Sequence, residues 1–281
     1  MATITCTRLT RGTDFSAPFQ TASVSPGANK LLLLGVQVYR SVGTPATPTA
    51  SGNGLTWVQV GSTVLYRSDS RLALFRAMGA SPSSGVITIT AASSDQVLWS
   101  LHEIDGVDTG GTNGSAAVVQ SDTATGTGAS SITVTLAAFA SGASAGFGFG
   151  ARFSAGGTFT AEADWSEQDD LNGQTVVFRD GTTDNSVTFT PSSVDDLGGI
   201  ALELAPPAGT PIASSCSMAV TVSTSISDAL IAMPVVTIYA GTNQAPQQTA
   251  TSLDVEVTAT IEHHPVTATL DGSHECRATT E

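Results

Sequence analysis

The chain has 281 residues, of which 41% are hydrophobic, enough to bury one large β-domain and a smaller one. Only 12% are charged, the net charge is −14, and Lys30 is the single lysine. Because binding to a phosphate backbone requires a basic footprint, this composition argues against direct contact with nucleic acid. Exposed helix positions usually carry Glu, Lys and Arg, so the shortage of these residues predicts an all-β protein.

Strand patterns recur between residues 30 and 207, separated by clusters of Gly, Ser, Asp and Pro. The predicted strands lie, in chain order, within residues 30–40, 71–77, 85–92, 96–106, 130–139, 145–152, 174–180, 185–191 and 198–207. Neither a convincing helical pattern nor a tandem repeat is apparent among them. Without alternating strands and helices, the pattern predicts an antiparallel β-sandwich of jelly-roll type and not a parallel-sheet enzyme fold.

Aromatic residues are few, and their positions predict core packing. Trp57 follows an Asn-Gly turn and Trp99 lies within a predicted strand, so both are expected to plug the space between the two sheets. Phe147 and Phe149 alternate with glycines, which predicts rings that pack against a closely approaching strand.

The predicted domain organisation has three parts. A sandwich spans residues 1–205, and a proline-containing linker occupies residues 206–215. Residues 216–281 alternate at period two, but they are too few to bury much core alone. We therefore expect a small β-rich assembly domain that packs on a neighbour, on the first domain or on a copy of itself.

The N-terminal sequence MATITCTRLTRG lacks the apolar core of a secretion signal, and the longest apolar run, from Leu31, is too short to span a bilayer. These features predict synthesis in the cytoplasm without a membrane contact. The cysteines Cys6, Cys216 and Cys276 show no metal-binding spacing. Two states stay open for them: a Cys216–Cys276 disulfide, or three reduced thiols, which suit a reducing compartment.

No catalytic residue is predicted. His102 lies beside Glu103 in a strand, where we expect a half-buried structural residue, and the sequence holds no GxSxG nucleophile elbow. Calcium could use oxygens of residues 179–185, and zinc could use the C-terminal residues His263, His264, His274 and Cys276. Turn chemistry explains the first pattern, and adjacent strand histidines point to opposite faces. Accordingly, neither a metal nor a cofactor is predicted.

One acidic loop is a candidate for carbohydrate contact. Trp165 could stack on a sugar while Asp164, Asp169 and Asp170 accept its hydroxyl hydrogens. The alternative is a solvated loop beside a core tryptophan, and both readings stay open at this point.

Several segments together resemble a known family. Five segments are similar, in this order, to the β-sandwich domain of many tailed-bacteriophage virion proteins: FQTASVSPGANKLLLLGVQVYRS, GNGLTWVQVGS, RLALFRAMGASPSSGVITIT, VLWSLHEIDGVDTGGTNG and DDLGGIALELAPP. The resemblance covers residues 1–205 and carries no catalytic motif.

The resemblance implies a non-enzymatic virion protein whose partners are its own copies and other virion proteins such as the major capsid protein. A head-decoration or cement protein on the capsid surface is the first expectation. The alternative is a tail-associated or head-fibre adhesin that binds host surface glycans.

Overall fold

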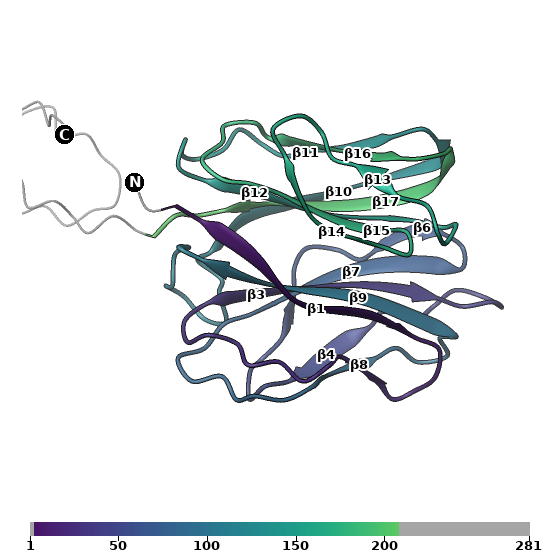
Figure 1. Ribbon diagram of the computed structural model, residues 1–281, viewed down its shortest axis with the longest axis horizontal. Coiled ribbons are helices and arrows are strands. Elements are labelled where there is room, and N and C mark those ends of the chain that lie inside the picture. The colour runs from purple at the N-terminus through teal and green to yellow at the C-terminus, as the bar shows by residue number, and fades with distance from the viewer. Residues whose placement is uncertain (1–2, 208–281) are drawn as a thin grey trace, which may run out of the picture. The chain divides into compact units, whose positions relative to one another are not determined.

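The computed structural model describes residues 3–207, which contain seventeen strands and no helix (Figure 1). All pairings between these strands are antiparallel, so the predicted all-β sandwich class is confirmed. No helix that could cross a membrane occurs within this range. The predicted assembly domain 216–281, with Cys216, Cys276 and the C-terminal histidines, lies outside the described residues, as does most of the predicted linker 206–215.

The first half of the described chain forms one sandwich. Its strands are β1 (Thr5–Asp14), β2 (Phe19–Gln20), β3 (Leu31–Tyr39), β4 (Thr49–Gly52), β5 (Val58–Gln59), β6 (Val64–Arg67), β7 (Ser70–Ala77), β8 (Ile87–Thr90) and β9 (Gln96–Asp105). The larger sheet has the order β1-β9-β3-β7-β5, with β6 also paired to β7, and the smaller sheet has the order β2-β8-β4.

The second half forms another sandwich. Its strands are β10 (Val118–Ala129), β11 (Ile132–Thr135), β12 (Ala145–Arg152), β13 (Phe159–Thr160), β14 (Ser166–Leu171), β15 (Gln174–Arg179), β16 (Ser186–Pro191) and β17 (Asp195–Leu204). The larger sheet has the order β10-β17-β12-β15-β14, and the smaller sheet has the order β11-β16-β13.

Both halves share one topology. In each, the first strand pairs with the last, the second with the next to last, and the third with the third from last, as when a long antiparallel hairpin is rolled into a jelly roll. The single sandwich expected over residues 1–205 is therefore two jelly rolls in tandem. The sequence shows no evident tandem repeat, but the strand topology of the described residues repeats.

The repeat can be followed in the sequence once the strands are aligned. Segment 87–104 aligns with segment 187–204 without a gap, so that each residue of the first sandwich corresponds to the residue one hundred positions later in the second. The identical pairs are Thr88 and Thr188, Thr90 and Thr190, Ser93 and Ser193, Asp95 and Asp195, and Glu103 and Glu203.

The four sheets stack as layers, with the two larger sheets in the middle (Figure 1). The central core between them includes Leu33 and Leu74 from the first half and Phe149 and Leu202 from the second. Separate cores fill the space between each larger sheet and its smaller partner. Such a stack buries both faces of the inner strands β3 and β12, which explains the continuous apolar run of β3.

The aromatic residues occupy the cores as predicted. Trp99 is buried in the first sandwich, and Trp57 is half-buried against the same core. Phe149 packs on Gly35 of β3, where an added Cβ would come within 2.6 Å of the ring. The alternating Phe-Gly pattern therefore marks the contact between the two sandwiches.

Candidate functional site

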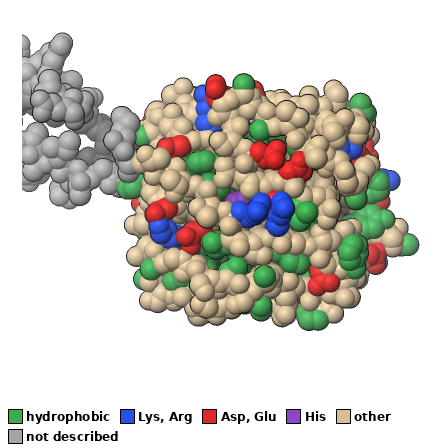
Figure 2. Space-filling view, in the orientation of Figure 1, with side chains coloured by type: hydrophobic (Ala, Val, Ile, Leu, Met, Phe, Trp, Pro, Cys, Tyr) green, Lys and Arg blue, Asp and Glu red, His purple; other side chains and the backbone are tan. Residues whose placement is uncertain are grey.

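Two margins flank the central core, each formed by edge strands of the two larger sheets. At one margin β1 lies beside β14, and at the other β6 lies beside β10. The first of these, which we call the charged seam, carries a basic patch beside acidic side chains on the face shown in Figure 2.

Asp169 is the centre of the charged seam. Its carboxylate belongs to β14, is almost fully buried, and accepts hydrogen bonds from Arg8 Nη1 at 3.0 Å and from Arg11. Its second oxygen accepts a hydrogen bond from Ser100 Oγ at 2.5 Å. Because the arginines and Ser100 belong to the first sandwich, these contacts fasten the second sandwich to it.

His102 continues the cluster inward from Ser100. Its Nε2 lies 2.8 Å from Ser100 Oγ, and its Nδ1 lies 3.5 Å from Cys6 Sγ. The side chain is 0% exposed, so the half-buried position expected from the sequence was wrong. β9 belongs to the larger sheet of the first sandwich. One face of this sheet packs on the smaller sheet and the other on the second sandwich, so both faces of β9 are buried.

The chemistry of this cluster is that of a structural clamp. Burial lowers the pKa of His102 to about 4 and raises the pKa of Cys6 to about 12. Both groups are therefore neutral at pH 7, and Cys6 lacks the thiolate that a nucleophile needs. The hydroxyl of Ser100 lies between Asp169 and His102, whereas a nucleophilic triad places the imidazole in the middle.

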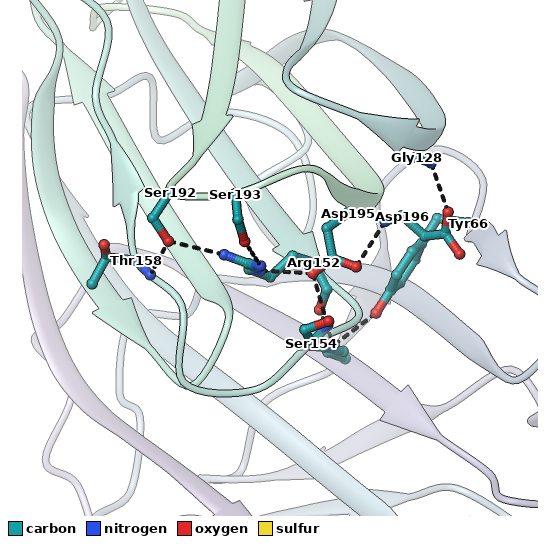
Figure 3. A network of polar contacts seen from close by, with 10 residues as sticks. Tyr66, Gly128, Arg152, Ser154, Thr158, Ser192, Ser193, Asp195 and Asp196 are labelled. Carbon is teal, nitrogen blue, oxygen red and sulfur yellow. Dashed lines mark hydrogen bonds and ion pairs between the residues drawn. The ribbon is translucent and has the colours of Figure 1, made fainter.

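A second buried network surrounds Arg152, at the end of β12 (Figure 3). Arg152 Nε donates to Asp195 Oδ2 at 2.8 Å, and its two terminal nitrogens donate to Ser192 Oγ at 3.1 Å and Ser193 Oγ at 2.7 Å. Burial raises the pKa of Asp195, but the Ser154 amide and the Arg152 guanidinium outweigh it and hold that pKa below its ordinary value.

The Arg152 network also reaches the first sandwich. Gln37 Nε2 donates to Tyr66 OH at 2.7 Å and to the Arg152 carbonyl at 3.2 Å. The guanidinium of Arg67 lies 3.4 Å above the centre of the Phe153 ring, a cation–π contact. Together with the charged seam, this network joins the two sandwiches at separate places.

Two further carboxylates, one in each sandwich, accept hydrogen bonds from equivalent loops. Glu103 accepts the amide of Gly27 at 2.6 Å, and Glu203 accepts the amide of Ala140 at 2.7 Å and the hydroxyl of Ser144 at 2.8 Å. In each case the bonded loop precedes the third strand of the jelly roll. The identity of these glutamates between the repeats thus reflects a shared structural role.

The structure does not bring the four predicted glycan-contact residues onto one surface. Trp165 is buried in the core between the second larger sheet and its smaller partner. The carboxylate of Asp169 is already bonded to Arg8, Arg11 and Ser100 in the charged seam. Asp170 accepts a hydrogen bond from the amide of Phe159 at 2.9 Å, and of the four residues only Asp164 projects into solvent. The core position of Trp165 agrees with the alternative reading of this segment.

Segment 179–185, which was considered as a source of calcium ligands and explained by turn chemistry, uses its oxygens internally. Asp180 accepts the amide of Ile4 at 3.0 Å, and Asp184 accepts Arg179 Nη1 at 2.9 Å. Within residues 3–207 no group of three or more His, Cys, Asp or Glu side chains is arranged to hold a metal ion.

Exposed apolar side chains gather on the loops at one end of the molecule. β1 and β3 end there and β9 begins there, since Asp14 pairs with Val97 and Tyr39 with Gln96. The corresponding end of the second sandwich adjoins it, as the contact of Arg67 with Phe153 shows. Three large apolar side chains on these loops are strongly exposed: Phe15 (70%), Val42 (77%) and Val194 (64%).

We call this set of loops the loop end. An open hollow of about 440 Å³ is lined by residues 17–19, which follow Phe15 closely in the sequence, and by residues 88–94. β1 begins and β17 finishes at the opposite end, so the chain continues past residue 207 from the end remote from these apolar loops. Sequence reasoning missed the loop end, because single apolar residues in polar loops carry no periodic signal.

Comparison with known proteins adds no identity: no family model, curated protein or solved structure matches this chain.

Proposed function

We propose that this protein is a non-enzymatic structural protein of a tailed-phage virion, bound to the capsid surface as a decoration or cement protein. The observation that carries the proposal is the difference between the two ends of the molecule. Two clamped sandwiches form one block, apolar side chains are exposed on the loops at one end, and the chain continues from the other end. The family resemblance of residues 1–205 supports the same reading.

The proposed mechanism is the burial of apolar surface. Phe15, Val42 and Val194 would leave water when the loop end docks on the shell, and each buried side chain of this size contributes about 1.5–3 kcal/mol. A stable contact of ordinary size buries about 1,600 Å², and symmetry multiplies it over a particle. Other virion proteins, such as the major capsid protein, are the proposed partners.

Reconstitution tests this proposal. Purified protein added to phage particles that lack it should bind and raise the temperature at which the heads release their DNA. The triple variant Phe15→Ser, Val42→Ser, Val194→Ser should bind more weakly, although its own melting temperature should change little because these side chains are exposed. Unchanged particle stability, with no bound protein, would contradict the proposal.

One observation favours the alternative, an adhesin for host surface glycans. Phe15 presents an exposed ring at the loop end, and the hydroxyl-bearing residues Thr88, Thr90 and Ser93 are among those that line the hollow. A ring and hydroxyls together can stack on and hydrogen-bond a sugar. Absence of binding to a glycan array would remove this alternative.

A further inference from the structure

The longest strand of the described structure is an unpaired edge. β10 has twelve residues and pairs with β17 on one side, and no strand within residues 3–207 pairs with its other side. A free edge of this length leaves backbone amides and carbonyls available to a further strand. Two amides of β10 are already bonded to side chains, that of Thr123 to Asp122 and that of Gly128 to Asp196.

β10 differs from the other long edges in charge. β1 carries Arg8 and Arg11, and β14 carries Glu167, Asp169 and Asp170, the charges with which natural proteins protect an edge. β10 carries one charged residue, Asp122, the fifth of its twelve residues, and the six residues that follow Thr123 are small and uncharged. This edge therefore lacks protection by charge. Register shifts between Val118 and Gln120 and between Gly126 and Ala129 interrupt its pairing with β17 only near its two ends.

The same margin also exposes apolar side chains. Val119 of β10 is 46% exposed and Leu65 of the neighbouring β6 is 45% exposed. The equivalent margin in the repeat, the charged seam, is instead closed by the ion pairs of Asp169. The margin of β10 and β6 is thus the one with an uncharged edge, and Val119 and Leu65 are single exposed side chains near its two opposite ends.

We propose that β10 pairs antiparallel with β10 of a second copy of this chain, so that two larger sheets join into one continuous sheet across a two-fold axis. A two-fold axis places each strand against itself, and like charges on β1 or β14 would then face each other. The uncharged segment 123–129 of β10 meets this condition. This proposal does not depend on a virion function.

The test is the mass of the full-length protein in solution. By sedimentation, the wild-type chain should be a dimer, and Thr125→Lys, at an exposed position of β10, should raise the dissociation constant at least about tenfold. Thr135→Lys is the matched control, because Thr135 is also an exposed threonine but lies on β11. It should leave the dimer intact. A monomeric wild type, or a Thr125→Lys variant as dimeric as the control, would overturn the proposal.

Hydrogen exchange distinguishes the occupants of this edge. If β10 pairs with a second copy, amides of β10 should become protected as the protein concentration rises, while those of β1 and β14 should not change. Protection that is the same at all concentrations would show that another segment of the same chain covers the edge. That result, like fast exchange at every concentration, would overturn the proposal.

Discussion

Replacing Arg152 with methionine is expected to lower the free energy of unfolding by about 3–5 kcal/mol, because it leaves the buried Asp195 carboxylate without its partner. The side chains of Arg152 and Asp195 are only 4% and 6% exposed, so water cannot replace the lost contact without structural change. Ser192 and Ser193 also lose their donor. Urea unfolding at pH 7, followed by circular dichroism, measures the effect.

Two controls separate burial from charge. Arg179→Met breaks a more exposed pair with Asp184 and should cost less than about 1 kcal/mol. The double variant Arg152→Met, Asp195→Asn removes both charges and should be more stable than Arg152→Met alone. If Arg152→Met costs no more than Arg179→Met, the network of Figure 3 does not hold the structure as described.

Stability is expected to fall on mild acidification because of His102. Burial lowers its pKa from 6.5 to about 4, while nearby Asp169 raises it and Arg8 lowers it. Between pH 6.5 and pH 4, His102 is therefore protonated in the unfolded chain but neutral in the folded chain. The resulting loss is absent well above pH 6.5 and grows to about 2 kcal/mol at pH 5 and about 3 kcal/mol at pH 4.

The matched measurement compares the wild type with His102→Gln at pH 7 and pH 5. Glutamine keeps a polar partner for Ser100 but does not titrate, so the difference between the two curves isolates this one histidine from the three near the C-terminus. The wild type should lose about 2 kcal/mol more than the variant between these pH values. Equal losses would mean that His102 is accessible to protons in the folded protein.

The fold class and the strands of the cores could be predicted, whereas most edge strands could not. β3, β7, β9 and β12 are flanked by neighbours on both sides, so their apolar runs stand out in the sequence. β1, β10 and β14 lie at sheet edges and are rich in hydroxyl and charged residues, as in the run SDTATGTGA of β10. Such runs read as loops when the partner strand is unknown.

The repeat escaped detection for a related reason. Core positions demand volume and not identity, so Leu33 in the first sandwich corresponds to Phe147 in the second, each facing the central core. The identities that survive are polar residues with a bonding role, such as Glu103 and Glu203. A few such matches are too sparse to notice without the strand register.

The buried clusters were also beyond prediction. Asp169 contacts Arg8 across 161 positions of sequence, and neither residue has a local pattern that names its partner. In the sequence Asp169 reads as one acid among several in a polar segment. Only the stacking of the two sandwiches turns it into a buried acceptor.

The central claim, a place on the capsid surface, is tested most directly by locating the protein on intact particles. An antibody against this chain, labelled with gold and viewed by electron microscopy, is predicted to decorate the heads. Label confined to the tail tip, or particles without label, would contradict the account.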